Sequence, residues 1–282
     1  MKTNRILLSL ALMLSVALVQ ADELYVGLQD GTLNAVAELT GSLSLTAQRT
    51  MPGAVHGLAA GPAGSFFVGI GNGVYRYIDA GTQTASILAS PTTAFRALAA
   101  NNGAIYCGLA DGSLNAVAKC TLTLTFVNQS AVAGPVSGLA AGPYGTYFVA
   151  SGNKIYKYSD PGAILASLAG SATTVMRDAA YNGSQLYVSL QDNGLNAVAI
   201  LNSNLGLIRQ INLPNGLITA LAADAHGEFY AASANVIYHY DANGNLLGSI
   251  VGSPTTKFID MAYYASPTRA SRPAKPIVGK LP

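Results

Sequence analysis

Tryptophan is absent from this 282-residue chain, only 10% of its residues are charged, and it has two cysteines and three histidines. No Gly-x-Ser-x-Gly motif is present and neither cysteine has a plausible activating base, so a serine or cysteine hydrolase is not expected. Gly, Ala, Ser, Thr and Tyr are abundant instead. This composition is typical of short strands separated by glycine-rich turns and not of amphipathic helices.

Long apolar runs are also missing, with one exception at the N-terminus. Lys2 and Arg5 precede an apolar run from Ile6 to Val19, whose 14 residues fall short of the roughly 20 that a membrane-spanning helix needs. Residues 1–21 therefore have the pattern of a secretory signal peptide cleaved after Ala21, and no cysteine follows to carry a lipid anchor. We expect a periplasmic or secreted protein with no transmembrane segment.

The chain has no excess of basic charge once this segment is removed. Cleavage takes Lys2 and Arg5 from the 15 basic residues and leaves 13, against 13 acidic residues, so nucleic acid is not an expected partner. Residues 266–282 hold four basic residues and no acidic one: Arg269, Arg272, Lys275 and Lys280. This proline-rich tail is predicted to be disordered; the alternative is an adhesive arm for an acidic partner or membrane surface.

What the chain has in quantity is repetition. Residues 24–37 read LYVGLQDGTLNAVA, and close copies follow at 105–118 and 186–199. A second phrase, GLAAGP and its variants, lies between these copies, and a third, PTT or ATT followed by an apolar run, marks the junctions. Together the phrases give one related unit about every 40 residues, which is the period of propeller blades and of some helical repeats.

The units have the pattern of strands. Short alternating runs of Val, Ile, Leu, Phe and Tyr are bounded by Gly, Asn, Asp and Pro, and none keeps a helical period over ten residues. Asp30-Gly31 and Asp111-Gly112 stand between two such runs, which predicts type I′ hairpins centred on these dipeptides. In the third copy the turn reads Asp192-Asn193-Gly194, and we expect it to be one residue longer.

One unit contains four predicted strands, at residues 55–60, 65–70, 74–78 and 84–89. Four antiparallel strands in 40 residues make a propeller blade, and stacking blades around an axis buries both faces of each sheet. We therefore predict an all-β, six-bladed β-propeller over residues 22–265, with pseudo-threefold symmetry built from blade pairs. The strand at 257–264 should complete the N-terminal blade and close the ring.

The unit at residues 55–81 contains the sequence GLAAGPAGSFFVGIGNGVYRYIDAG. This unit resembles the NHL repeat. The resemblance implies a six-bladed propeller of the NHL, lactonase-like kind, in which a divalent cation such as calcium would lie in the channel on oxygen ligands. Asp178 and Asp260 occupy equivalent positions and are the candidate ligands. Because the three Glu residues lie elsewhere, we expect no metal or other cofactor; the alternative is a hydrolase or lyase that uses Asp178, Asp260 and His56.

Propellers bind ligands at the channel mouth, where the inner strands begin. The second position of the six predicted inner strands reads His56, Arg96, Ser137, Arg177, Thr219 and Ile259, and the third reads Gly57, Ala97, Gly138, Asp178, Ala220 and Asp260. His56, Arg96 and Arg177 are the candidate ligand-binding residues, suited to a carboxylate, sulfate or phosphate. The alternative is that Arg96 and Arg177 form ion pairs with Asp178 and Asp260 across the channel.

Two further patterns are assigned to packing. In the Tyr-basic-Tyr triplets at 75–77, 156–158 and 238–240, alternation puts both Tyr on one face, and His239 is expected to face solvent. Cys107 and Cys120 are predicted to be free core residues, because a turn centred on Asp111-Gly112 would offset them by about 13 Å along the strands, too far for a disulfide.

The sequence thus predicts an exported, monomeric, non-catalytic propeller that presents a binding surface to a protein, peptide or glycan.

Overall fold

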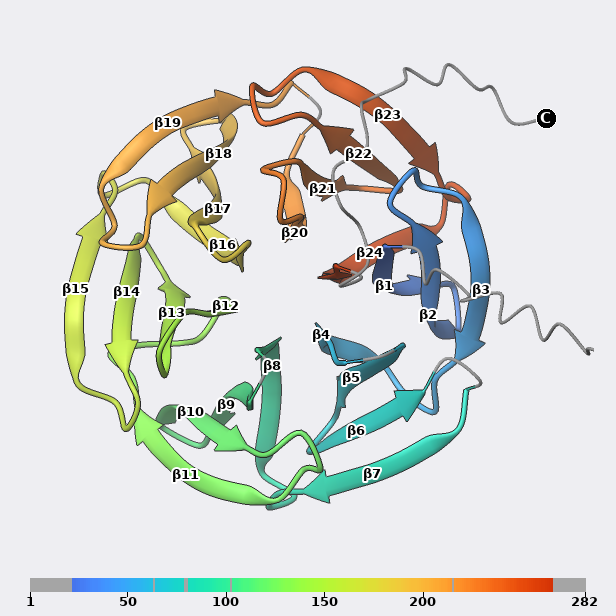
Figure 1. Ribbon diagram of the computed structural model, residues 1–282, viewed down its shortest axis with the longest axis vertical. Coiled ribbons are helices and arrows are strands. Elements are labelled where there is room, and N and C mark those ends of the chain that lie inside the picture. Colours follow the sequence, from blue (N-terminus) through green and yellow to red (C-terminus); the bar gives the residue numbers. More distant parts are fainter. Residues whose placement is uncertain (1–21, 63, 79–80, 102, 215, 266–282) are drawn as a thin grey trace, which may run out of the picture.

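The computed structural model describes residues 22–265 apart from residues 63, 79–80, 102 and 215. Its regular elements are all strands, which form six four-stranded antiparallel sheets around a central axis (Figure 1). This confirms the predicted six-bladed propeller. The expected signal peptide and tail, residues 1–21 and 266–282, lie outside the described residues. Within the described part of the chain, no helix is long and apolar enough to span a membrane.

Blades 1, 3 and 5 carry the LYVGL-LNAVA phrase in their two middle strands. From the axis outward, blade 1 consists of β24 (Thr256–Tyr264), β1 (Glu23–Asp30), β2 (Leu33–Thr40) and β3 (Leu45–Thr50). Blade 3 consists of β8 (Thr93–Ala100), β9 (Ile105–Asp111), β10 (Leu114–Cys120) and β11 (Phe126–Ala131). Blade 5 consists of β16 (Val175–Tyr181), β17 (Gln185–Asp192), β18 (Leu195–Asn202) and β19 (Leu207–Asn212).

Blades 2, 4 and 6 carry the GLAAGP phrase at the end of their inner strand. Blade 2 consists of β4 (Val55–Ala60), β5 (Ser65–Ile70), β6 (Gly73–Ile78) and β7 (Gln83–Leu88). Blade 4 consists of β12 (Gly138–Ala141), β13 (Thr146–Ser151), β14 (Lys154–Ser159) and β15 (Ile164–Ala169). Blade 6 consists of β20 (Ile218–Ala223), β21 (Phe229–Ser233), β22 (Val236–Tyr240) and β23 (Leu246–Val251).

The hairpin turns of the odd blades differ from the prediction by one residue. Asp30 pairs with Leu33, Asp111 with Leu114 and Asp192 with Leu195, so all three turns have the same length and each Asp is the last strand residue. The central residues are therefore Gly31-Thr32, Gly112-Ser113 and Asn193-Gly194. Only the third turn has positive φ at both positions, 47° and 85°. The type I′ turns predicted at Asp30-Gly31 and Asp111-Gly112 are therefore wrong. The longer turn expected in the third copy is wrong as well, because that copy has a two-residue turn with the type I′ pattern.

The three Asp residues that precede these turns form hydrogen bonds to the starts of the inner strands. The Asp30 carboxylate accepts hydrogen bonds from Ser253, at 2.7 Å, from Thr256, at 3.0 Å, and from Thr255. Asp111 and Asp192 receive the same kind of bonds from the Thr92-Thr93 and Thr173-Thr174 pairs. These hydrogen bonds, that from Thr255 first, lower the pKa of Asp30.

The chain closes through the same contact. β24 pairs with β1 from Thr256 opposite Asp30 to Tyr264 opposite Glu23, and Ser253, Thr255 and Thr256 come from the end of the chain while Asp30 comes from its start. The C-terminal strand completes the N-terminal blade, as predicted. The third repeated phrase therefore supplies hydroxyl donors, and the first supplies their acceptor.

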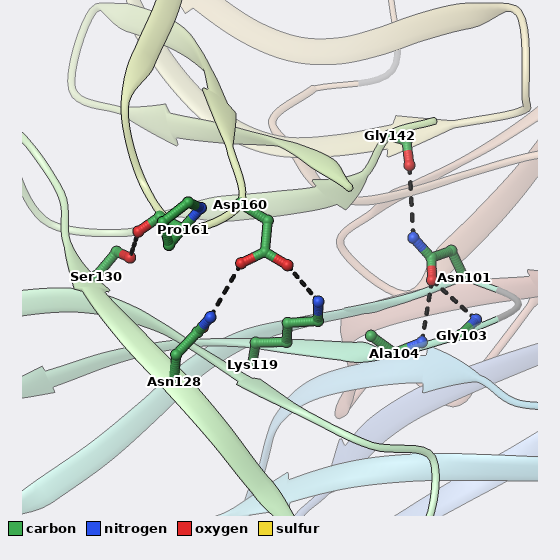
Figure 2. Close-up of polar contacts among 9 residues, drawn as sticks. All are labelled: Asn101, Gly103, Ala104, Lys119, Asn128, Ser130, Gly142, Asp160 and Pro161. Carbon is green, nitrogen blue, oxygen red and sulfur yellow. Dashed lines mark hydrogen bonds and ion pairs between the residues drawn. The ribbon is translucent and has the colours of Figure 1, made fainter. Parts of the chain in front are cut away.

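Blade junctions add polar contacts away from the axis. Figure 2 shows the junction of blades 3 and 4, where Lys119 from β10 and Asn128 from β11 donate to the carboxylate of Asp160, which follows β14. Burial alone would raise the pKa of Asp160, but the hydrogen bonds from Lys119 and Asn128 outweigh it and lower that pKa. Nearby, the Asn101 amide reaches the carbonyl of Gly142 at 3.5 Å.

Aromatic contacts extend from one sheet to the next, as the Tyr-basic-Tyr pattern predicted: Phe66 of blade 2 packs against Tyr25 of blade 1 with ring centroids 5.1 Å apart. Tyr77 stacks on Phe66 with ring centroids 5.4 Å apart, while its neighbour Arg76 lies over Phe67 on the opposite face, 5.9 Å from the ring centroid. The expectation for His239 is wrong. Its ring stacks on Tyr230 at 4.3 Å and its Nε2 lies 2.9 Å from Glu228, so it is largely covered.

Candidate functional site

The six inner strands surround the channel in the order β4, β8, β12, β16, β20 and β24 (Figure 1). Five of them have a β-bulge at the second predicted position, where one residue is left without a partner in the neighbouring strand: His56, Arg96, Arg177, Thr219 and Ile259. The sixth inner strand, β12, begins directly after Ser137, which occupies the corresponding position. A bulge bends its strand and redirects one side chain. The variable residues of the repeat are therefore collected at one channel mouth.

Two of the residues at this position bind the next blade. The Ser137 hydroxyl donates to the carbonyl of Met176 in β16 at 2.8 Å, and the Thr219 hydroxyl donates to the carbonyl of Phe258 in β24 at 3.0 Å. Short hydroxyl side chains at the second predicted position thus join blade 4 to blade 5 and blade 6 to blade 1. Within the described residues, the longer basic residues at the same position do not make this contact.

The three predicted ligand-binding residues, His56, Arg96 and Arg177, are the basic members of this ring. His56 and Arg96 are exposed on neighbouring inner strands, and Arg177 lies on the strand opposite β4. Partial desolvation, and then the charge of Arg96, lower the pKa of His56. The Arg177 guanidinium donates to Gln191 at 3.2 Å, and its buried Nε has no acceptor among the described residues. The mouth therefore offers hydrogen-bond donors, with two permanent positive charges.

Asp178 and Asp260 lie one residue deeper and bind backbone amides. The Asp178 carboxylate accepts from the amide of Ala179 at 2.7 Å and from that of Leu221, in the next blade, at 2.6 Å. Asp260 accepts in the same way from Met261 at 2.8 Å and from Leu58 at 2.6 Å. Each carboxylate joins two neighbouring inner strands. Ion pairs of these carboxylates with Arg96 or Arg177 are not found among the described residues, so the predicted alternative of channel ion pairs is wrong.

Burial strongly affects both carboxyl groups. They line a channel cavity of about 100 Å³ together with the inner-strand residues around them. Burial raises the pKa of Asp178 to about 7, although the amides of Leu221 and Ala179 act in the opposite direction. Burial also raises the pKa of Asp260 well above its usual range, and the Asp178 charge adds to this. At neutral pH the two carboxyls therefore do not both carry a full negative charge.

Two blades have glycine where blades 5 and 1 have these Asp residues. A Cβ on Gly138 would lie 2.4 Å from the Asp178 Cα, and one on Gly57 would lie 2.9 Å from the Leu98 amide nitrogen. At these junctions the inner strands approach too closely for any side chain. The third position of the inner strands therefore sets the spacing around the axis, by a close backbone contact or by a carboxylate bridge.

The channel does not fit the divalent cation that the NHL resemblance implies. Calcium takes six to eight oxygen ligands, whereas Asp178 and Asp260 already direct both oxygens at amides. In the described part of the chain, no three His, Cys, Asp or Glu residues gather as a metal-binding group. The carboxylates act as bridges between strands in this geometry.

A second hollow lies on the same face as the bulges. A cleft of about 550 Å³ separates the β21–β22 turn from the β1–β2 turn and the start of β24. Its lining is mostly polar or small: Gln29, Gly31, Ala234, Asn235, Pro254, Thr255, Thr256 and Lys257. No sequence pattern indicates this cleft, because its residues lie far apart in the chain and meet only through ring closure.

No family model matches the chain, and no curated protein matches it in sequence. A protein of unknown function from Bacteroides caccae is similar in structure, with a TM-score of 0.69 and 13% sequence identity over 86% of this chain and 99% of that one. A chain in a nidogen/laminin complex is similar with a TM-score of 0.66 and 15% identity, over 87% of this chain and 99% of that one. At these identities the similarity concerns the fold alone.

Proposed function

We propose that this chain is an exported, non-catalytic propeller that binds an anionic group of a protein, peptide or glycan at the mouth formed by His56, Arg96 and Arg177. Within this proposal it is an NHL-like propeller, periplasmic or secreted, that acts as a monomer and needs no cofactor. The observation that carries the proposal is the ring of bulges, which carries His56, Arg96 and Arg177, none of them paired with a carboxylate among the described residues.

The chemistry of these side chains favours a carboxylate, sulfate or phosphate. A guanidinium presents parallel N–H donors that match a planar or tetrahedral oxyanion, and such charge-assisted hydrogen bonds are stronger than neutral ones. The exposed side chains of His56 and Arg96 form no ion pair in the described part of the chain and can donate to ligand oxygens. The cleft beside Lys257 on the same face offers room for the rest of the ligand.

A protein partner is supported by one structural neighbour, which comes from a nidogen/laminin complex. The alternative function, a lactonase-like hydrolase or lyase, would require Asp178 and Asp260 to release the backbone amides that they bind. The metal content of the purified protein tests this alternative, since a stoichiometric divalent ion that is lost in Asp178→Ala and Asp260→Ala would support the enzyme.

The proposed function is tested on arrays of sulfated and carboxylated glycans and of acidic peptides. Wild type is compared with the Arg96→Ala/Arg177→Ala variant and with Arg209→Ala, which removes a basic residue from the outer strand β19. The double variant should bind its best array ligand at least about tenfold more weakly, since charged hydrogen bonds contribute about 1.5–3 kcal/mol each. Equal binding by all three proteins would contradict the proposal.

A further inference from the structure

The two cysteines of the chain lie side by side in blade 3. In the β9–β10 pair, Cys107 is opposite Ala118 and Cys120 is opposite Ile105, so the cysteines are diagonal neighbours on one face of the sheet. This differs from the predicted offset because the hairpin turn is centred one residue later than expected. Both side chains belong to one buried cluster, and the Cys107 thiol hydrogen-bonds to the sulfur of Cys120.

The other two copies of the phrase have an apolar pair at these positions. Blade 1 has Val26 and Leu39, and blade 5 has Val188 and Leu201, in the same diagonal register. Blade 3 differs at both positions at once. A cysteine in place of leucine leaves a smaller side chain in a packed core, which is unfavourable by itself. The paired change is explained if the two sulfurs interact with each other.

We propose that Cys107 and Cys120 are a disulfide site, oxidised while the chain folds by a small organic disulfide, and that the structure holds its dithiol form. Diagonal neighbours in a sheet lie about 7–8 Å apart at Cα, with Cβ atoms closer, and disulfides span up to about 7 Å. A small slide of β10 along β9 that shortens this diagonal is therefore needed to form the bond. This inference is independent of the proposed function.

The chemistry is an exchange in two steps. The Cys120 thiolate attacks one sulfur of the organic disulfide, forms a mixed disulfide and releases one thiolate. Cys107 then loses its proton and attacks the Cys120 sulfur, which releases the second thiolate. The two cysteines are oxidised, and the organic disulfide is reduced to two thiols.

Burial determines when this exchange takes place. Only 1% of Cys107 and 2% of Cys120 is exposed in the folded chain, and the pKa of Cys107 is raised by its hydrogen bond to Cys120 and by burial. An oxidant therefore reaches the pair before blade 3 packs against its neighbours. We expect the native dithiol protein to resist the same oxidant.

The test is refolding of the full chain from urea with oxidised or with reduced glutathione, followed by alkylation and mass spectrometry. Oxidised glutathione should give an intramolecular Cys107–Cys120 disulfide with no alkylated cysteine, and reduced glutathione should give two alkylated cysteines. Native protein that is given oxidised glutathione for the same time should stay reduced. Free thiols or glutathione adducts after oxidative refolding would overturn the proposal.

A matched control and a second measurement exclude an incidental bond. Cys107→Val/Cys120→Leu restores the residues of the sister copies, and its melting temperature should not depend on the glutathione used. Oxidised wild type should melt roughly 5 °C above the dithiol form, because the bond restricts the unfolded chain. An oxidised form that melts at or below the dithiol form would show that the bond does not belong to the native fold.

Discussion

Two successive positions of the inner strands have different roles, although they are neighbours in every repeat. The bulge position carries His56, Arg96 and Arg177, which are wholly or partly exposed at the mouth and form no ion pair within the described residues. The next position carries Asp178 and Asp260, which are directed at backbone amides inside the channel. Basic residues at the bulge position alter what the mouth presents, whereas Ser137 and Thr219 there join neighbouring blades. Variation at the next position alters how closely the inner strands approach.

The physical reason for this difference is the unpaired edge of the inner strands. Each inner strand pairs with one neighbour only, so its other edge directs amide groups at the axis, where buried donors need acceptors. Asp178 and Asp260 supply such acceptors across two of the six junctions. His56 and Arg96 are exposed at their bulges and form no ion pair within the described residues, which leaves them available for a ligand.

The largest effect is expected where the inner strands touch. Gly138→Ala places a Cβ 2.4 Å from the Asp178 Cα, so blades 4 and 5 must separate, and unfolding should become easier by about 3 kcal/mol. Gly248→Ala in the outer strand β23 is the control, because nothing lies within 4 Å of the added Cβ. Chemical denaturation measures both variants. Equal stability of the two would show that the third position does not set blade spacing.

A smaller loss is expected when a carboxylate bridge is removed. Asp260→Ala leaves the Leu58 and Met261 amides without their acceptor, which should cost about 2 kcal/mol in the free energy of unfolding. Asp260→Asn keeps one acceptor oxygen and should cost less. If Asp260→Ala is as stable as wild type, the Asp260 carboxylate does not stabilise the junction between the inner strands.

The same carboxyls should make stability depend on pH. The folded pKa of Asp178, about 7, lies above its ordinary value of 3.8, so its contribution is fully present below pH 3.8 and is lost as the pH rises to 7. Thermal melts should therefore show wild type gaining stability relative to Asp178→Asn/Asp260→Asn as the pH falls from 7 to about 4. Parallel pH profiles for the two proteins would contradict the raised pKa values.

The smallest effect on stability is expected at the bulges. His56→Gln should change the free energy of unfolding by no more than about 0.5 kcal/mol. Wild type should bind an anionic array ligand more tightly as the pH falls through the pKa of His56, which lies below its ordinary value of 6.5, because the imidazolium adds a positive charge. Calorimetric titrations at several pH values should show this gain lost in the Gln variant. An unchanged pH dependence would exclude His56 from the mouth site.

The architecture could be predicted from the sequence because the same unit is repeated, so each copy tests the interpretation of the others. The strands at 55–60 and 65–70 have the predicted bounds, and the outer two differ by one residue. The hairpin turns were misplaced because Asp-Gly is a strong turn signal, whereas Asp30 is held in the strand by Ser253, Thr255 and Thr256. A Ser-x-Thr-Thr sequence stands at the start of the inner strand of each of the three blades that contain this Asp. That recurrence indicates the contact.

The candidate site could be predicted only in part. The sequence identified the two positions at which the repeats disagree, but it suggested that Arg96 and Arg177 would pair with Asp178 and Asp260. Side-chain charge alone suggests such ion pairs, but backbone amides compete for the same carboxylates. The amides of Leu58 and Leu221 lie nearer to them than any guanidinium of the described residues. Partners on neighbouring inner strands are fixed by the curvature of the ring, which no spacing in the sequence records.

The central claim is that the basic residues at the bulge position bind the ligand, whereas the residues at the next position hold the blades together. It is tested most directly by measuring affinity and stability on one variant. Arg96→Ala/Arg177→Ala is titrated calorimetrically with the sulfated glycan or acidic peptide that binds wild type best, and its melting temperature is recorded in the same buffer. The account predicts a loss of affinity of at least about tenfold with an unchanged melting temperature. Two results would contradict this division of roles: retained affinity, or a loss of affinity accompanied by a lower melting temperature.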